Sequence, residues 1–364
     1  MTCRPNASIP SALLNWFAAN KRDLPWRKCR TPYRVWISEI MLQQTQVSTV
    51  IPYYLAFIER FPTISSLARA SQDAVLKMWE GLGYYARARN MHRAAGQIMA
   101  EHNGEIPDDL ATLRALPGIG DYMAGMILSL AYEQDVPALD ANGYRVLARL
   151  CGIQQPIDKS AIRRQLWEIA GELIPAGSAG AFNEALIELG ALVCTPRSPA
   201  CDTCPLSNGC QAYAQELQDA IPIRRPRRRP PHRDVTAAVI WNEGKVLISQ
   251  RLNTSMLGGL WEFPGGKCEA GETHQICLKR EIEEELALHI DVGTHLITFD
   301  HAYSHIHITL HTYHCKPLDG PPQAIEVADW QWVALDELAN YPLSVADQRI
   351  AQALLKEAHS RSQS

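Results

Sequence analysis

The residues with the clearest chemical potential are four cysteines, Cys194, Cys201, Cys204 and Cys210, which fall within one short stretch, whereas the other six cysteines are scattered singly. Four thiolates in one loop suit a metal cluster, and ligation by four cysteines is the rule for [4Fe–4S] centres. A structural zinc site more often has two short cysteine pairs that are far apart in the sequence. The spacing therefore favours an iron–sulfur cluster, with zinc as the alternative.

The cysteine stretch contains Pro196, Pro199 and Pro205, which predict a wrapped loop rather than a helix. The first residues of the chain show no signal-peptide pattern, and no apolar run reaches the roughly 18 residues of a membrane span. We therefore expect a cytoplasmic protein. In a reducing compartment, clustered cysteines indicate metal binding rather than disulfides.

Two carboxylates lie in settings that suit acid–base chemistry. Glu39 interrupts the apolar run VWISEIMLQQTQV, and apolar surroundings would raise its pKa and keep it protonated near neutral pH. Gln43 and Gln46 are spaced to share a helix face with it. Asp140, in PALDANGYRVLARL, precedes a helical run, where Asp is also a typical N-cap.

The stretch LRALPGIGDYMAGMILSLAY predicts two helical segments joined by a turn with Gly118 and Gly120. The two glycines can leave successive N–H groups free at the start of the second helix, where they attract an anion such as a DNA phosphate. A turn of this kind on its own is more often only a tight turn. Here the surrounding region is basic and LDANGYRV follows about twenty residues later, which favours a helix-hairpin-helix that binds DNA.

The charge distribution divides the chain in two. Through residue 233 there are 26 Lys and Arg against 21 Asp and Glu, a net charge of +5, and the remainder has 9 against 18, a net charge of −9. The stretch IPIRRPRRRPPHRD at the junction is rich in Pro and Arg and predicts a stiff basic linker. A basic first half with a basic linker indicates a polyanionic partner.

The periodicity of apolar residues gives the fold class. Before the linker, segments such as SALLNWFAAN and RRQLWEIAGELI show helical spacing, and after it DVTAAVIW and KVLISQR alternate as strands around a helix at HQICLKREIEEEL. We predict a multidomain protein with an all-α domain over residues 1–221, including the cysteine loop at 194–210. A linker at 222–234 and an α+β domain at 235–364 complete it.

These motifs together resemble a known family. The helix-hairpin-helix, the following Asp, the spacing C-x6-C-x2-C-x5-C, and the stretches LPWR, SEIMLQQTQV and GLGYYARARN are similar to the endonuclease III group of iron–sulfur DNA glycosylases, and within it to the adenine-specific branch. The resemblance runs from about Leu13 to Ala353. One departure is the family's Asp-Gly-Asn-Val, which reads Asp140, Ala141, Asn142, Gly143 here.

The resemblance implies a base excision repair enzyme that carries a [4Fe–4S] cluster and hydrolyses the glycosidic bond of adenine opposite 8-oxo-guanine or guanine. Glu39 would protonate the flipped adenine, and Asp140 would stabilise the cationic sugar. The residues Tyr122 and Asn142 would position the sugar and Asp140. The expected partner is double-stranded DNA with one of these mispairs, bound by a monomer that is associated with the bacterial nucleoid when it is on DNA. Gln44 would enter the gap left by the base, and Tyr84 would wedge in beside 8-oxo-guanine.

The second half resembles a MutT-like (Nudix) domain, which in this family reads 8-oxo-guanine; the resemblance places Ser304 and His305 in the recognition loop. The segment 266–288 fits the Nudix box at every defined position except Ala287, which replaces Gly. Clustered carboxylates of this kind can hold Mg²⁺ for pyrophosphate hydrolysis. We expect the box to be a remnant whose Glu281, Glu284 and Glu285 are not catalytic.

Two other functions fit parts of the sequence. An endonuclease III-like glycosylase/lyase for damaged pyrimidines would have a nucleophilic lysine just after the hairpin, where the sequence GIGDYM offers Tyr122 and no lysine. An iron–sulfur DNA-binding or redox sensor would need no paired acids, and Glu39 with Asp140 argues against it.

Overall fold

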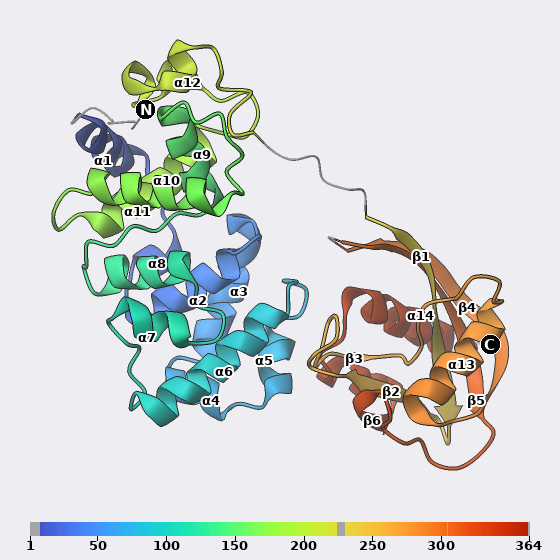
Figure 1. Ribbon diagram of the computed structural model, residues 1–364. Coiled ribbons are helices and arrows are strands. Elements are labelled where there is room, and N and C mark those ends of the chain that lie inside the picture. Colours follow the sequence, from blue (N-terminus) through green and yellow to red (C-terminus); the bar gives the residue numbers. More distant parts are fainter. Residues whose placement is uncertain (1–7, 224–229, 304, 363–364) are drawn as a thin grey trace. The chain divides into compact units, whose positions relative to one another are not determined.

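A computed structural model describes residues 8–223, 230–303 and 305–362, and its elements are labelled in Figure 1. By contacts the chain divides into two compact units. The first comprises residues 1–68 and 93–227, and the second comprises residues 69–92 and 228–364. Helices α4 (Ile64–Arg69) and α6 (Ala86–Glu101) contain the boundaries at residues 68 and 92, so each has residues in both units. The predicted domain boundaries at 221 and 235 stay predictions.

The first unit is helical. Its helices, with the two that cross the boundary, are α1 (Ile9–Asn20), η1 (Pro25–Arg27), α2 (Pro32–Leu42), α3 (Val47–Arg60), α4 (Ile64–Arg69), α6 (Ala86–Glu101), α7 (Leu110–Ala115), α8 (Asp121–Ala131), α9 (Ala141–Leu150), α10 (Ser160–Leu173), α11 (Ala179–Leu192), η2 (Cys201–Thr203), η3 (Ser207–Gly209) and α12 (Gln211–Ala214). Helix α11 packs against α1, α8 and α9, and α2 packs against α8 and α3. The helix α11 therefore connects the N-terminal helix with the two helices that follow the hairpin.

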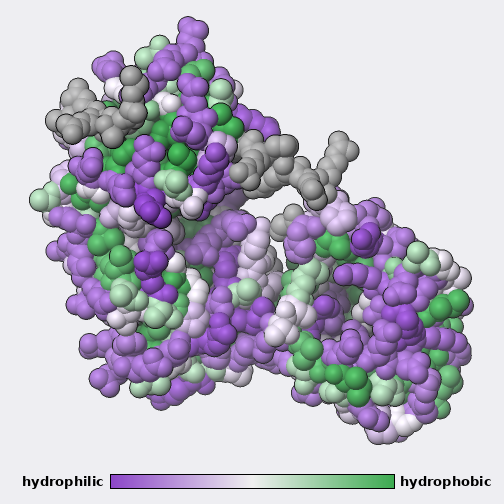
Figure 2. All heavy atoms as spheres, in the orientation of Figure 1, coloured by the Kyte–Doolittle hydropathy of each residue, from purple (hydrophilic) through white to green (hydrophobic). Residues whose placement is uncertain are grey.

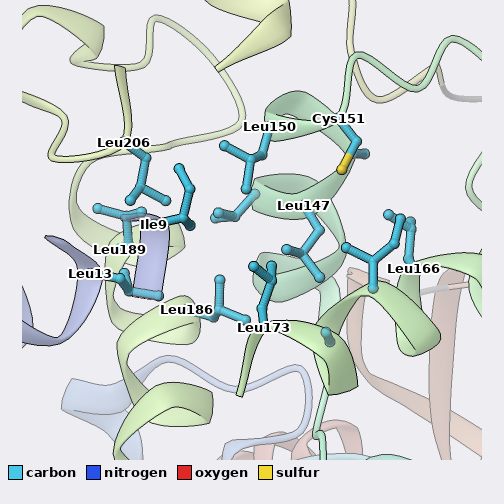
Figure 3. Packing of buried hydrophobic residues seen from close by; sticks show 14 of the residues in the cluster. Ile9, Leu13, Leu147, Leu150, Cys151, Leu166, Leu173, Leu186, Leu189 and Leu206 are labelled. Carbon is cyan, nitrogen blue, oxygen red and sulfur yellow. The ribbon is translucent and has the colours of Figure 1, made fainter. Parts of the chain in front are cut away.

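A buried apolar cluster joins α1, α9, α10 and α11 (Figure 3). Leu13 from α1, Leu147 from α9 and Leu186 from α11 are almost completely inaccessible to solvent. Each buried leucine of this kind contributes roughly 1.5–3 kcal/mol to folding. The cysteine loop is included in this core, since Leu206 packs in the same cluster.

Two acids of α11 are buried with arginines from the N-terminal segment. The Glu188 side chain is 1% exposed and accepts hydrogen bonds from the guanidinium groups of Arg22 and Arg27. Glu184 pairs with Arg27 at 2.9 Å and with Arg30 at 2.5 Å. Although burial raises the pKa of Glu188, the bonds from the two arginines outweigh this and lower it to about 2.

The predicted hairpin is present between α7 and α8. Gly118 has a φ of +79°, a backbone conformation that glycine adopts without strain. Gly120 is the N-cap of α8 with a φ of −100°, so it does not depend on that freedom. The N–H groups of the first turn of α8 start directly after it, as an anion site at a helix N-terminus requires.

The second unit contains α5 (Gln72–Met78) and an α+β domain. The strands of the domain are β1 (His232–Asn242), β2 (Lys245–Arg251), β3 (Trp261–Glu262), β4 (Ile290–Ala302), β5 (His307–Pro317) and β6 (Val327–Val333). They form one six-stranded sheet in the order β3-β2-β1-β5-β4, with β6 paired to β2. The pair β1–β5 is parallel, and the other pairs are antiparallel. Strands β1 and β5 are long, and their register aligns Val235 with Leu310.

Each face of this sheet is covered by a helix. On β1, Ala237 and Val239 face a cluster with Ile350 and Leu354 of α14 (Val345–Ser362). Ala238 and Ile240 face the opposite cluster, which includes Leu278, Ile282 and Leu286 of α13 (His274–Leu286). The alternation follows from the two-residue period of a strand. A short helix, η4 (Leu335–Asn340), precedes α14.

Ala287 ends α13 in the left-handed conformation, with a φ of +48°. The Nudix box has glycine at this position, where an alanine costs roughly 1–2 kcal/mol. The one position that differs from the Nudix box, Ala287, therefore ends α13 in a strained backbone conformation.

The predicted fold class is confirmed in its architecture: an all-α domain with a hairpin between α7 and α8 precedes an α+β domain. Helix α14, which closes one face of the sheet, was not predicted. The visible surface carries mainly hydrophilic residues (Figure 2). No helix in the described ranges is long and apolar enough to cross a membrane.

We expect Glu188→Ala to lower the free energy of unfolding by about 3–5 kcal/mol, because it removes the carboxylate shared by Arg22 and Arg27 and leaves Arg27 with its pair to Glu184. Urea unfolding followed by tryptophan fluorescence measures the change. The matched control is Asp23→Ala, which removes an ion pair to Lys28 whose side chains are 80% and 68% exposed. A loss no larger than that of the control would contradict the assigned weight of this buried network.

Candidate functional site

Helix α2 places Glu39 inside the protein, with 5% of the residue exposed. The Thr31 side chain caps the helix and Pro32 is its first residue, both favourable at a helix start. The hydroxyl of Tyr122, from the first turn of α8, donates a hydrogen bond to Glu39 Oε2 at 2.5 Å. Burial raises the pKa of Glu39 to about 7, with smaller contributions from Glu184 and Asp140, although the bond from Tyr122 lowers it. Glu39 can therefore donate a proton near neutral pH.

The Asp140 carboxylate caps the N-terminus of α9. Its Oδ1 accepts the backbone N–H groups of Asn142 and Gly143, both at 2.8 Å, and its Oδ2 accepts the Asn142 side-chain amide at 2.7 Å. Burial raises the pKa of Asp140, while these three bonds favour the charged form. These bonds hold the Asp140 carboxylate in one orientation. Its negative charge also raises the pKa of Glu39.

A buried arginine connects this carboxylate to the cysteine loop. The Arg145 guanidinium, 3% exposed, donates to Asn142 Oδ1 at 2.8 Å, to the Gly190 carbonyl at 2.7 Å and to the Cys194 carbonyl at 2.8 Å. Gly190 is required for this approach, since a Cβ atom there would lie 2.6 Å from Asn142 Cβ. Arg145 thus connects Asn142, and through it Asp140, to the backbone of Cys194, the first cysteine of the loop.

One turn further along α9, Arg149 is buried as well, at 2% exposure. It donates to the carbonyls of Thr195 at 2.7 Å and Ile221 at 2.8 Å, and to Cys194 Sγ at 3.3 Å. These bonds join the beginning of the cysteine loop to the end of the helical unit. A buried guanidinium has no other way to recover its lost hydration.

The four cysteines all line one small cavity of about 30 Å³, together with Arg149. All four thiols are free of disulfides. Within the described ranges no three His, Cys, Asp or Glu side chains meet closely enough to hold a single metal ion. Thiols spaced around a cavity suit a polynuclear cluster better than a tetrahedral zinc ion.

The four cysteine thiols need a nearby positive charge to bind a metal as thiolates. Burial, with repulsion from the neighbouring thiolates, raises the pKa of Cys204 to about 11. Cluster iron supplies the positive charge that would allow all four cysteines to bind as thiolates. The residues present therefore fit a [4Fe–4S] cluster, held by Cys194, Cys201, Cys204 and Cys210.

One expectation about the acid's helix is wrong. Gln43 and Gln46 do not share a helix face with Glu39, because α2 ends at Leu42 and α3 begins at Val47. Gln44 lies between them with a φ of +59°, and this left-handed residue ends the helix. Its side chain is exposed.

Tyr84 belongs to the second unit and is also exposed, with 43% of its surface accessible and a φ of +49°. The Arg87 guanidinium lies 5.5 Å from the ring of Tyr84 and 5.3 Å from that of Trp79, and it donates to the Gly83 carbonyl. These contacts preorganise an aromatic side chain at the surface.

Of the two residues expected to recognise 8-oxo-guanine, Ser304 and His305, the structure describes one. Ser304 lies outside the described residues. His305 is exposed, and its Nε2 atom is 2.8 Å from Met256 Sδ.

Sequence reasoning missed the charged residues that surround Glu39. Arg27 lowers and Glu184 raises its pKa, and both side chains are almost completely buried. Glu184 interrupts the apolar run AFNEALIEL, the same signal that identified Glu39. The buried arginines of α9 had no such signal, since arginine on an amphipathic helix usually faces solvent.

Three segments of the chain match known protein families. Residues 37–172 match the HhH-GPD superfamily of base excision DNA repair proteins, residues 194–210 match the iron–sulfur binding domain of endonuclease III, and residues 236–353 match the NUDIX domain.

Two curated relatives and one solved structure agree with these matches. The chain is 34% identical to an adenine DNA glycosylase of Rattus norvegicus, over 96% of this chain and 78% of that protein. It is 32% identical to an adenine DNA glycosylase of Homo sapiens, over 93% and 72%. A thermostable thymine-DNA glycosylase is similar in structure, with a TM-score of 0.53 and 28% identity, covering 57% of this chain and 95% of that one.

We expect the purified protein to be yellow-brown, with about four iron atoms per chain and no zinc. The variant Cys204→Ala should lose most of this iron and melt at a lower temperature, because the loop depends on the metal for its shape. Elemental analysis after anaerobic purification measures both metals, and Cys268→Ala is the control for loss of a thiol elsewhere. One zinc and no iron would overturn the assignment.

Proposed function

The chain belongs to the adenine DNA glycosylase family and is a DNA glycosylase of base excision repair, and we propose that its substrate is adenine paired with 8-oxo-guanine or guanine in duplex DNA. The observation that carries this proposal is the pair formed by Glu39, buried and protonated near neutral pH, and Asp140, held by three hydrogen-bond donors. A binding protein without hydrolysis would have no use for such a pair.

Cleavage of the glycosidic bond requires a proton on the leaving adenine. Glu39 delivers this proton to N7 of the flipped base and then assists the attacking water. Tyr122, bonded to Glu39, fixes the orientation of the acid. General acid catalysis of this kind contributes roughly 10²–10⁴-fold to a rate.

Departure of adenine leaves a sugar with oxocarbenium character. Asp140 stays ionised and stabilises this cation, and Asn142 holds Asp140 in place. The cluster supplies no hydrolytic chemistry; it fixes the cysteine loop. Arg145, which bonds both Asn142 and the Cys194 carbonyl, transmits the position of that loop to Asp140.

DNA is the partner of this enzyme, and the base must leave the stack to reach Glu39, which costs a few kcal/mol. In this proposal the exposed Gln44 fills the gap that the base leaves, and Tyr84 inserts into the duplex beside the opposite base. The hairpin glycines Gly118 and Gly120 would hold a phosphate at the start of α8. Action as a monomer and a location at the bacterial nucleoid remain predictions.

The reaction stops at base removal. A lyase needs an amine nucleophile, and the position after the hairpin is Tyr122 in GIGDYMAG, which contains no lysine. This feature separates the proposal from a glycosylase/lyase that acts on damaged pyrimidines.

The test of this function is incubation of the protein with duplexes that carry adenine opposite 8-oxo-guanine, guanine or thymine. We expect excision opposite 8-oxo-guanine and guanine, with strand breaks only after hot alkali. Borohydride trapping of the protein on DNA at the level of a lyase would argue for Schiff-base chemistry and against this proposal.

We expect Glu39→Gln and Asp140→Asn each to lower the single-turnover excision rate at least about a hundredfold while DNA affinity stays close to that of the wild type. Both changes remove an interaction with the transition state rather than a phosphate contact. A near wild-type rate in either variant would disprove the corresponding role.

The pH dependence of the rate tests the acid independently. Glu39 acts in its protonated form and has a pKa of about 7, so the rate should be highest below this pH. Above it, the rate should fall about tenfold per pH unit as the proton is lost. A rate that rises from pH 7 to pH 9 would show that Glu39 acts only as a base.

For lesion recognition, we expect the double variant Ser304→Ala, His305→Ala to reduce the preference for 8-oxo-guanine over guanine while excision opposite guanine persists. Hydrogen bonds to the atoms that distinguish the lesion would be lost, and the catalytic residues would be untouched. The ratio of single-turnover rates on the two duplexes is the measurement. His307→Ala, an exposed histidine of β5, is the control. An unchanged ratio would refute the division of roles.

A further inference from the structure

The second unit joins two segments that are far apart in the sequence. Residues 69–92, which include α5 and Tyr84, belong to the same compact unit as the α+β domain, which includes His305. The two side chains that the proposed function places at the opposite base therefore lie in one unit. Contacts between the two segments determine how Tyr84 and His305 are placed relative to each other.

Two side chains of the α+β domain bind the carboxylate of Asp73, in the first turn of α5. Asp73 Oδ2 accepts the indole N–H of Trp261 at 3.0 Å, and Oδ1 accepts the side-chain amide of Gln250 at 3.0 Å. Trp261 is 2% exposed and packs in the core of the domain. Gln250 is in β2 and Trp261 is in β3, so Asp73 binds both strands that flank the loop 252–260.

The loop 252–260 also contacts α5 directly. The Gln72 side chain donates to Asn253 Oδ1 at 3.0 Å. A Cβ atom on Gly259 would lie 2.7 Å from Gln72 Nε2, so this close approach requires glycine. The Gly259 carbonyl accepts a second hydrogen bond from the Gln250 amide, at 3.2 Å. The loop is therefore fitted to the first turn of α5 by both side-chain and backbone groups.

Further contacts extend from this loop and from α5 to the two side chains at the opposite base. His305 Nε2 lies 2.8 Å from the Sδ atom of Met256, a residue of the loop. Trp79, the C-cap of α5, is fully buried, and the Arg87 guanidinium lies over its ring and over that of Tyr84. A continuous series of contacts thus connects Tyr84 to His305.

We propose that Asp73 is a positioning residue for lesion discrimination, which holds the loop 252–260 so that His305 and Tyr84 meet the opposite base together. Asp73 acts through Trp261 and Gln250 rather than on the reacting atoms. An ionised carboxylate only accepts hydrogen bonds, so it suits two N–H donors, and such bonds are stronger than those between neutral groups. The inference rests on the proposed function, since it concerns the preference for 8-oxo-guanine over guanine.

The test is the ratio of single-turnover excision rates opposite 8-oxo-guanine and opposite guanine, measured on the full-length holoenzyme. Asp73→Ala should lower this ratio roughly tenfold, because two hydrogen bonds to a charged acceptor are lost. Excision opposite guanine should stay close to that of the wild type. Asp73→Asn keeps one acceptor oxygen and should restore part of the ratio. The matched control is Asp291→Ala, an exposed acid of β4, which should change neither rate.

A double-mutant cycle separates positioning from a general loss of stability. Trp261→Phe removes the indole donor but keeps an aromatic ring, and it should also lower the ratio. Combined with Asp73→Ala, it should lower the ratio no further than Asp73→Ala alone, because both changes remove one shared interaction. If Asp73→Ala does not fold, Trp261→Phe alone carries the test.

Hydrogen exchange provides a readout that does not depend on excision. The backbone amides of the loop 252–260 should exchange faster in Asp73→Ala than in the wild type, because the loop is no longer held. A lower melting temperature with an unchanged rate ratio would show a purely structural role and overturn the inference alone. A wild-type protein that has no preference for 8-oxo-guanine would refute the proposed function and this inference with it.

Discussion

The burial of two guanidinium groups along α9 is the interaction on which the rest of the site depends. Arg145 and Arg149 lie one turn apart and are 3% and 2% exposed. A buried charge is stable only when its donors are satisfied, and backbone carbonyls of the cysteine loop satisfy them. The helix that carries Asp140 at its N-terminus is therefore bonded directly to the loop that holds the cluster.

The helical unit uses buried glutamates in two opposite ways. Glu188 has two arginine partners and a pKa of about 2, so it is a permanent charge. Glu39 has a tyrosine partner and a pKa of about 7, so it can still carry a proton near neutral pH. Burial raises the pKa of both residues, and the hydrogen-bond partners determine which of them can act as an acid. Arg27, one of the two partners of Glu188, also lowers the pKa of Glu39, and burial outweighs this effect.

The sequence predicts the helices, the strands and the cysteine ligands of the cluster better than it predicts the tertiary contacts between helices and loops. Helical spacing and strand alternation predicted both domain types, and α13 was expected at the residues it occupies. The cysteine spacing favoured the cofactor. The end of α2 could not be foreseen, since the left-handed conformation of Gln44 is the local event that separates α2 from α3.

The arginines of α9 show the same limit at the site. Arginine at two positions one turn apart is typical of an exposed helix face, and only the folded loop reveals that both are buried. Likewise, the close approach of Gly190 to Asn142 depends on how α11 packs on α9, which no local pattern encodes.

The bond between Arg149 and the Ile221 carbonyl also constrains the order of events during synthesis. A chain emerging from the ribosome presents α9 and the cysteine loop before residue 221 has emerged, so Arg149 then lacks one of its acceptors. The loop can close fully only when the whole helical unit has left the exit tunnel. Completion of the hydrogen bonds that hold the cysteine loop is therefore coupled to the emergence of residue 221, at the end of the helical unit.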